Sequence, residues 1–251
     1  MRNRKIYSLS ILGCFLAAAL CGSMADAAVL YTSQLTAPPL TAGNLVGQDG
    51  WANHSGTGSL IQVGATGTTL VQGSGSREDA NVSVTPISTG QTYYFGFDVT
   101  VTGGAITPVY FAHFKDTGSD FTTRVWVMPP RQGGGFTFGL SAASTTTISS
   151  WASDFAFGST NRIIGSYNHS TLETKLWVNP VNSGSTSLSV VDTAPNAVSS
   201  FALRQATGES TQLITCLTVS DTFDEALTCI PEPTSIALLL GCVGVMVLRR
   251  K

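Results

Sequence analysis

Residues 93–101 read Tyr93-Tyr94-Phe95-Gly96-Phe97-Asp98-Val99-Thr100-Val101 and alternate between two kinds of side chain. Successive side chains of a β-strand point to opposite faces of a sheet, so the aromatic and β-branched residues at the odd positions share one face. The even positions, which include Asp98 and Thr100, point the other way. The stretch therefore predicts a strand in a sheet that is buried on one face only.

The same alternation recurs from Val29 to Val219, and helical periodicity is almost absent. Clusters of Gly, Pro, Asn or Ser separate the further apolar runs, which are Val109–Phe114, Thr123–Met128, Phe136–Leu140, Arg162–Tyr167, Leu172–Val178, Phe201–Leu203 and Leu213–Val219. Roughly a dozen strands in about 200 residues predict a two-sheet sandwich, and they fit a jelly roll better than an immunoglobulin-like domain.

We therefore predict an all-β protein with a single antiparallel, jelly-roll-like β-sandwich over residues 28–220. A short stalk, residues 221–230, follows it, and Asp221 is expected to cap a helical turn at 221–227. The sandwich lies between an N-terminal signal peptide and a C-terminal transmembrane helix, for which the evidence is given below.

The composition favours an exported β-rich protein. Only 11% of the residues are charged and 43% are hydrophobic, a balance that excludes intrinsic disorder. Six of the 13 basic residues and two of the 15 acidic residues lie at the two ends of the chain, so the body holds seven basic and 13 acidic residues and a net charge near −6. An acidic body argues against a nucleic-acid partner.

The N-terminus has the three parts of a secretory signal. Arg2, Arg4 and Lys5 precede an apolar run, residues 9–21, and Ala25 and Ala27 then supply the small residues for cleavage after Ala27. We predict that residues 1–27 are a signal peptide. The alternative of a permanent membrane helix is disfavoured because the run is shorter than the ~20 residues that cross a bilayer. Lipid attachment at Cys21 is disfavoured because Leu20 directly precedes it.

The C-terminus carries a second signal. Pro231, Glu232 and Pro233 precede an apolar stretch, residues 235–248, and the chain ends with Arg249, Arg250 and Lys251. An apolar helix would stop in the inner membrane, and the basic tail would hold its end on the cytoplasmic side. The stretch is short for a crossing, although snorkelling of Arg249 would lengthen it. A buried core helix is the alternative, but three terminal basic residues have no role in a core.

This order of motif, apolar stretch and basic tail resembles the PEP-CTERM sorting signal of Gram-negative bacteria. The resemblance implies that a membrane transpeptidase-like enzyme, exosortase, recognises Pro231-Glu232-Pro233 in residues 231–251. It also implies that the inner membrane holds the precursor transiently, and that the protein ends at the cell surface or in the extracellular matrix of cells that make polysaccharide.

The body also carries landmarks that look like those of many PEP-CTERM proteins, similar in pattern to laminin-G-like and concanavalin-like sandwiches. They are Gly47–Trp51, Arg124–Val127, Phe138–Ser141, Leu176–Pro180, Phe201–Gln205 and Leu217–Ser220. The resemblance implies a fold and a location, and it implies no activity.

Two cysteines, Cys216 and Cys229, lie in the mature body, since Cys14 and Cys21 belong to the leader and Cys242 to the apolar tail. An even pair in an oxidising compartment predicts a disulfide, which would fasten the stalk to the sandwich. Closing this loop is expected to stabilise the fold by roughly 2–3 kcal/mol. The alternative is two free cysteines, which a thiol reagent would label without prior reduction.

The sequence predicts no enzyme. Glycan-cleaving sandwiches need two carboxylates across a cleft, and no predicted strand carries acids at positions i and i+2 or i+4. Glu78 and Asp79 are adjacent and would point to opposite faces. No G-x-S-x-G elbow is present, and His113 lies in the run with Val109 and Phe111, where we expect a packed or rim histidine.

No metal or cofactor is predicted, because no His, Cys or carboxylate cluster has zinc spacing and no EF-hand pattern occurs. Calcium at Asp116 and Asp120 is an alternative to a plain solvated loop.

The four tryptophans raise the question of glycan binding, because sugar rings stack on exposed aromatic faces. Trp126 and Trp177 lie within alternating runs and are expected in the core. Trp51 and Trp151, which Gly, Asn and Ser flank, are the candidates for a glycan platform, with packing as the alternative. We predict an exosortase-sorted surface or matrix protein with a structural or adhesive role. A non-catalytic, lectin-like module that binds extracellular polysaccharide is the alternative, and a glycan-active hydrolase is the weaker one.

Overall fold

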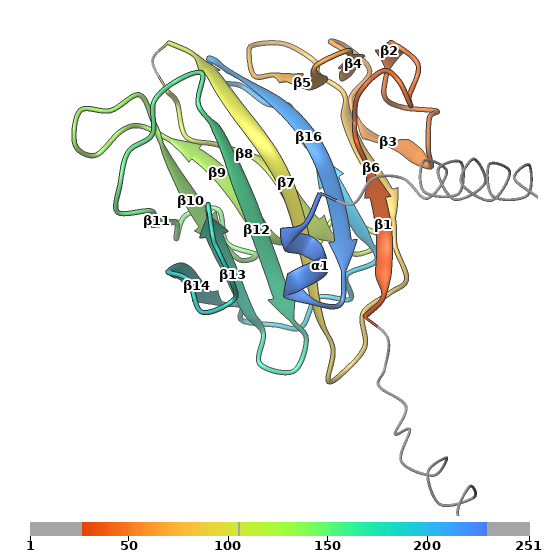
Figure 1. Cartoon of the computed structure of the whole chain (residues 1–251), viewed down its shortest axis with the longest axis vertical. Coiled ribbons are helices and arrows are strands. Elements are labelled where there is room, and N and C mark those ends of the chain that lie inside the picture. Colours follow the sequence, from red (N-terminus) through yellow and green to blue (C-terminus); the bar gives the residue numbers. More distant parts are fainter. Residues whose placement is uncertain (1–26, 105, 230–251) are drawn as a thin grey trace, which may run out of the picture.

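The computed structural model describes residues 27–104 and 106–229, which form two antiparallel β-sheets packed face to face (Figure 1). The larger sheet has the order β14 (Ser187–Val191), β13 (Glu173–Val178), β12 (Thr160–Asn168), β7 (Thr92–Gly103), β16 (Ser210–Ser220), β5 (Gly67–Val71), β4 (Gln62–Gly64) and β2 (Gly43–Asn44), with β1 (Val29–Ser33) also beside β16. The smaller sheet has the order β11 (Ser149–Ser150), β10 (Thr137–Ser141), β9 (Phe121–Met128), β8 (Val109–Lys115), β15 (Ser200–Leu203), β6 (Asp79–Ser83) and β3 (Trp51–Ser55). We refer to them as the nine-stranded and the seven-stranded sheet. The predicted all-β sandwich is confirmed.

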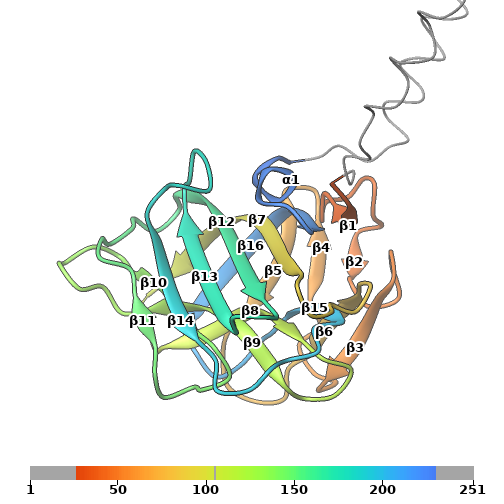
Figure 2. The ribbon, with the colours of Figure 1, turned by 90° about the horizontal axis from the view of Figure 1, so that it is seen from below.

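Each apolar run of the sequence overlaps a strand, and β7 shows the predicted alternation. Tyr93, Phe95, Phe97, Val99 and Val101 are buried, whereas Tyr94, Asp98 and Thr100 are half-buried. Figure 2 shows β7 and β12 in one layer and β8 and β9 in the other. The buried face of β7 therefore points at the seven-stranded sheet.

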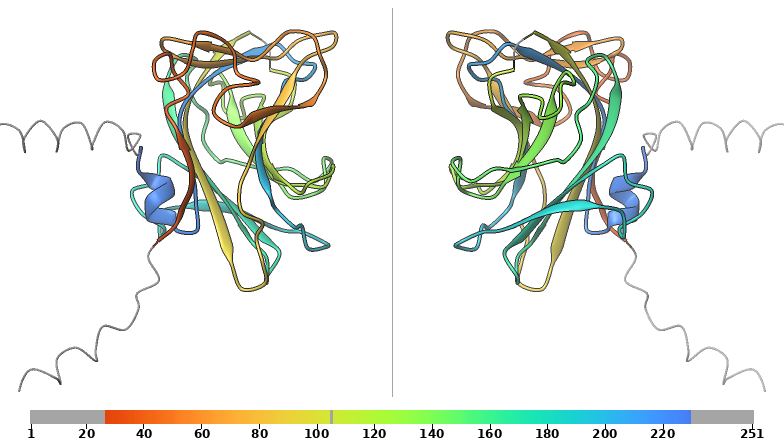
Figure 3. Two further views of the ribbon diagram at one scale, coloured as in Figure 1. Left: turned by 90° about the vertical axis from the view of Figure 1, so that its right-hand side faces the viewer. Right: turned by 90° about the vertical axis from the view of Figure 1, so that its left-hand side faces the viewer.

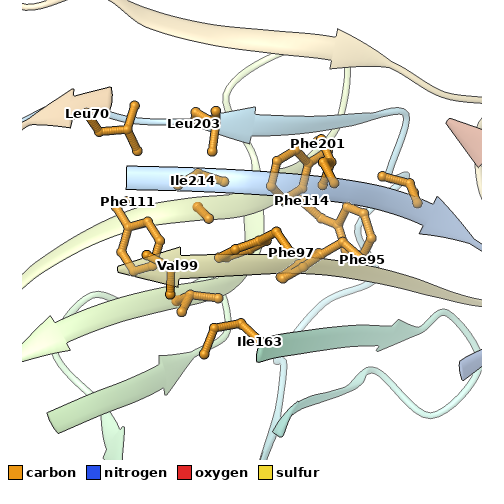
Figure 4. Close-up of a cluster of buried hydrophobic side chains, with 14 of the residues drawn as sticks. Leu70, Phe95, Phe97, Val99, Phe111, Phe114, Ile163, Phe201, Leu203 and Ile214 are labelled. Atoms are coloured by element: carbon orange, nitrogen blue, oxygen red, sulfur yellow. The ribbon is translucent and has the colours of Figure 1, made fainter. Parts of the chain in front are cut away.

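A cluster of phenylalanines joins the two sheets (Figure 4). Phe201 of β15 lies 5.1 Å from Phe95 and 6.1 Å from Phe97, measured between ring centroids, and Phe114 of β8 lies 4.8 Å from Phe95. Gly165 of β12 is required beside this cluster, because a Cβ there would lie 2.1 Å from the Phe95 ring. Tight aromatic packing of this kind is a major source of stability in a sandwich.

A β-bulge at Cys216 divides β16 into two halves. The register with β7 shifts between Thr215 and Thr218, and Cys216 has a φ of 57°. The first half of β16 pairs with β5 and the second half with β1. Because the bulge changes the phase of the alternation, Leu217 enters the core and Cys216 takes the outer face.

The residues after β16 pack against the outer face of the nine-stranded sheet. The helix α1 (Phe223–Leu227) buries Phe223 and Ala226 against Ile164 and Trp177, and Figure 3 shows it on the side away from the seven-stranded sheet. Its N-cap is Thr222, so the prediction that Asp221 caps it is wrong. Asp221 instead accepts a hydrogen bond from the backbone N–H of Ala28 (2.9 Å).

Two further contacts hold this segment in place. The predicted disulfide between Cys216 and Cys229 is present, and the Arg162 guanidinium donates to the backbone oxygens of Ala226 (2.6 Å) and Thr228 (3.2 Å). Gly96 of β7 leaves room for α1, because a Cβ there would lie 1.9 Å from the Ala226 oxygen. The segment predicted as a stalk therefore packs on the sandwich as far as residue 229.

The predicted targeting segments lie outside the described residues. They include all of the signal peptide except Ala27, the motif Pro231-Glu232-Pro233, the apolar stretch 235–248 and the basic tail 249–251. Among the residues that the structure describes, no helix is both long and apolar enough to span a bilayer.

Candidate functional site

The outer face of the seven-stranded sheet carries side chains that two β-bulges direct there. In β8, Phe111 and Phe114 both enter the core although they are three residues apart, and the register with β9 shifts between them. Strict alternation would place His113 on the face of Phe111. The bulge instead places it beside Tyr110 on the outer face, with ring centroids 5.5 Å apart. Bulges of this kind re-aim side chains and occur frequently next to functional sites.

The neighbouring strand β9 has the second irregularity. Thr123 has a φ of 51°, and its hydroxyl donates to the backbone oxygen of Ser166 in the opposite sheet (3.2 Å). Thr122 is paired with the core residue Phe114 of β8 and therefore shares its face, so two consecutive residues leave the outer face. Phe121 and Arg124, three residues apart, thereby come together on that face, where the guanidinium carbon lies 5.4 Å from the ring centroid.

These side chains form a continuous set that we call the basic aromatic face. It comprises Tyr110, His113, Phe121, Arg124, Trp126 and Arg204. Tyr110 is at its centre, with the guanidinium carbon of Arg204 4.1 Å and that of Arg124 5.3 Å from its ring centroid. Arg124 also donates to the backbone oxygens of Ala142 and Ala143. Cation–π contacts with the Tyr110 ring hold both guanidinium groups against the outer face of the sheet.

His113 is completely buried in this face, which confirms the prediction of a packed histidine. Neither of its ring nitrogens has a hydrogen-bond partner among the residues that the structure describes. Burial lowers its pKa well below the usual range of histidine, and the charges of Arg124, His54, Arg204 and Lys115 lower it further. The imidazole is therefore neutral at pH 7, in surroundings that are rich in basic groups.

We expect the free energy of unfolding to fall as the pH drops below about 6.5. The unfolded chain protonates His113 near that pH, whereas the folded chain does so only at lower pH, so stability is full above about pH 6.5 and is lost below it, by at most about 1.4 kcal/mol per pH unit. Urea denaturation between about pH 5 and 8 measures this slope. In His113→Leu the slope below pH 6.5 should be smaller, and an unchanged slope would refute the assignment.

A polar pocket of about 500 Å³ opens beside the basic aromatic face, over β3, β6, β15 and the end of β8. Its hydrogen-bonding lining comes from Asn53, Asn81, Ser83, Thr117, Ser199 and Ser200. His54 and Lys115 add basic groups, and Val84 and Pro86 add an apolar wall. His54 also stacks on Phe121 with ring centroids 5.4 Å apart, so the polar pocket and the basic aromatic face are continuous.

The electrostatics of the polar pocket follow from its neighbours. Burial lowers the pKa of His54, as does the charge of Lys115, while Asp79 and Asp116 raise it. Burial raises the pKa of Asp79, although hydrogen bonds from the Gln205 N–H and from Ser55 stabilise its carboxylate. Asp116 accepts the backbone N–H groups of Gly118 (2.8 Å) and Asp120 (3.0 Å). The described part of the chain contains no cluster of three or more metal-ligating side chains.

A second, smaller pocket of about 210 Å³ lies on the other side of Phe121. Arg124, Asp192 and Asn196 are among its lining residues. The Asp192 carboxylate accepts hydrogen bonds from Thr122 (3.2 Å) and from the Ala143 N–H (3.1 Å), so it is engaged in holding the loop after β10. This second pocket carries one arginine and two acids, whereas the polar pocket has no carboxylate in its lining.

The structure does not assemble the predicted glycan platform. Trp51 is 2% exposed, and its indole N–H donates to the Tyr31 hydroxyl (2.9 Å) in the core, so neither ring face is available for stacking. Trp151 is half-buried and packs against the core next to β11, which is the opposite edge of the sheet from β3. The two residues therefore cannot form one platform. Trp126 is buried, as expected, but it packs against Tyr110 in the basic aromatic face and not between the two sheets.

The residues of the polar pocket were not predicted from the sequence. Asn81 and Ser83 alternate with buried Ala80 and Val82 along β6, so a short alternating run from Asp79 was the available signal. Lys115 carried no comparable signal, because its orientation depends on the bulge in β8.

Comparisons with known proteins identify the architecture. No family model and no curated protein matches the chain. A sialidase structure shares the fold with a TM-score of 0.58 at 10% identity, covering 88% of this chain, and the chain spans only 21% of that protein's length. An alginate lyase from Alteromonas sp. 272 (TM-score 0.42, 11% identity, 76% of this chain and 93% of that one) and lectin II from Ulex europaeus (TM-score 0.46, 12% identity, 78% and 100%) are also similar.

Proposed function

We propose that this chain is an exported surface or matrix protein whose β-sandwich binds polysaccharide in the polar pocket without cleaving it. The observation that carries this proposal is the pocket itself. Six amide and hydroxyl side chains converge from three strands and two loops on a volume of about 500 Å³, next to an aromatic face. Sugar hydroxyls are recognised by convergent groups of this kind on a rigid scaffold.

The lining suits a binding role better than a hydrolytic one. A glycoside hydrolase needs two carboxylates that flank the scissile bond, and the lining of the polar pocket contains none. Shared fold alone does not assign a function, although a sialidase with the same sandwich is consistent with a glycan ligand. The proposal therefore depends on the side chains of the pocket.

Affinity electrophoresis of the full chain through gels that contain different polysaccharides tests this proposal. At least one polysaccharide should retard the protein, and Asn53→Ala with Asn81→Ala should weaken that binding by about tenfold, since each amide is expected to hold a sugar hydroxyl. The control is Asn182→Ala, an exposed amide between β13 and β14 that is remote from the pocket. Equal binding by pocket variant and native chain, or release of reducing ends from the bound glycan, would refute the proposal.

We also propose that an exosortase sorts the protein through residues 231–251. The support is the order of Pro231-Glu232-Pro233, the apolar stretch and the basic tail in a chain for which a signal peptide is also predicted. Mass spectrometry of the C-terminus after cell fractionation tests it. The native chain should lose Arg249-Arg250-Lys251, and a chain with Ala at positions 231–233 should keep them in the inner membrane. Retention of the tail by both chains in the same membrane would show that the protein is simply tail-anchored.

A further inference from the structure

The polar pocket contains a buried ammonium group that forms no ion pair within the described residues, although the charge of the neighbouring Asp116 acts on it. Lys115 is 3% exposed and lines the pocket, and its Nζ donates to the backbone oxygen of Asp116 (2.8 Å). Across residues 27–104 and 106–229 the two ion pairs are Arg162–Asp98 and Lys175–Glu173, so Lys115 is in neither. A buried charge without an ionic partner is costly unless a ligand supplies one.

The acids nearest to Lys115 direct their hydrogen bonds elsewhere, although the charge of Asp116 partly offsets the lowering of the Lys115 pKa by burial. Asp116 directs its carboxylate at the N–H groups of its own turn, and Asp79 is held by Ser55 and the Gln205 N–H. An ammonium has three N–H donors, and the backbone oxygen of Asp116 accepts one of them. The remaining donors are available to a group in the pocket.

A second unpaired group lies in the same pocket. Ser199 is 6% exposed, and its hydroxyl has no hydrogen-bond partner in the described protein. Buried hydroxyls are satisfied in most folded proteins, so an unpartnered one indicates a missing acceptor or donor. A ligand oxygen in the pocket would satisfy it.

Basic residues gather around the pocket, beside the two acids Asp79 and Asp116. Three of the seven basic residues of the body, Lys115, Arg124 and Arg204, gather on this outer face, although the body as a whole is acidic. This share of the basic residues is larger than the acidic body as a whole would suggest and favours an anionic ligand.

Resting on the function proposed above, we propose that the polar pocket binds an acidic polysaccharide, with a sugar carboxylate or sulfate against Lys115 Nζ and ring hydroxyls on Asn53, Asn81 and Ser199. The anionic group forms the ion pair that Lys115 lacks. The amides and hydroxyls fix the orientation of the sugar, and the apolar wall of Val84 and Pro86 lies against its C–H groups.

The test measures the affinity of the full chain, purified in mild detergent, for polygalacturonate, dextran sulfate and neutral dextran of similar length. The Kd for at least one acidic polymer should be at least about tenfold lower than for dextran, and it should rise with salt concentration. The relative affinities for polygalacturonate and dextran sulfate distinguish carboxylate from sulfate.

Lys115→Met, which keeps the length of the side chain and removes its charge, should weaken acidic binding by at least about tenfold and leave dextran binding unchanged. Lys115→Arg should retain most of the affinity. The control is Lys175→Met on the nine-stranded sheet. The salt dependence of the native chain provides a readout that does not depend on whether a variant folds.

The possible outcomes separate the two proposals. Equal affinity for acidic and neutral polymers, or binding that is independent of salt, would overturn the acidic ligand and keep polysaccharide binding. An equal loss of affinity for the acidic polymer in Lys175→Met and Lys115→Met would show that the polymer is attracted by the positive charges of the protein in general. That result would also overturn the acidic site. Binding to no polysaccharide would overturn both.

Discussion

Phe201→Ala should destabilise the sandwich by about 3–5 kcal/mol, which is a large part of the stability of a typical domain. Phe201 is fully buried and contacts Phe95 and Phe97 from the opposite sheet, Phe114 from the next strand and Trp51 from the sheet edge. Its removal leaves a cavity among rings that β-strands on both sides hold in place, so the surroundings cannot close over it.

Urea denaturation followed by tryptophan fluorescence measures this effect. The matched control is Phe157→Ala, because Phe157 is 37% exposed and packs mainly on Phe136. That substitution should lower the free energy of unfolding by much less. Comparable losses in the two variants would mean that Phe201 does not join the two sheets in solution.

Reduction of the disulfide between Cys216 and Cys229 should lower the free energy of unfolding by about 2–3 kcal/mol. The bond joins two cysteines that are 13 positions apart and closes a loop that contains α1, and the reduced unfolded chain regains the entropy that the loop removes. Reduction should also loosen α1 from the sheet, because Arg162 would then be the main polar contact that holds it.

Unfolding curves with and without reductant measure the effect, and the fluorescence of Trp177 beneath α1 reports on the helix. Cys229→Ser is the control, since Cys229 is exposed and its replacement removes the bond with little change in packing. This variant should resemble the reduced native protein and should not respond to reductant. A further loss on adding reductant to Cys229→Ser would show that the reductant acts elsewhere.

The sequence predicted the sandwich because its signal is repeated along every long strand. The alternation in β7 is uninterrupted, so both its buried face and its place in a sheet could be inferred. The pairing of Cys216 with Cys229 followed from counting cysteines in the mature body. Burial of Trp51 was not resolved, because flanking Gly and Asn residues are as compatible with a turn beside the core as with an exposed platform.

The candidate site could not be predicted because it depends on two departures from alternation. The bulge near Ala112 brings Tyr110 and His113 onto the outer face. The bulge near Thr123 brings Phe121 and Arg124 onto the same face. A bulge adds one residue to a strand and so shifts every later side chain to the other face. No single residue type in the sequence marks the position of a bulge. The packing of α1 on Trp177 is a tertiary contact that the local pattern around Asp221 does not contain.

The disulfide also determines how the body would respond to tension. A force applied to the chain beyond residue 229 would pass through the disulfide to Cys216, in the interior of β16. It would therefore not detach α1 and the end of β16 from the sheet one residue at a time. There it must shear the ladders that join β16 to β7 and β5. None of these three strands lines the polar pocket, which lies on the opposite sheet. The fold therefore separates the part that bears a mechanical load from the part that holds a ligand.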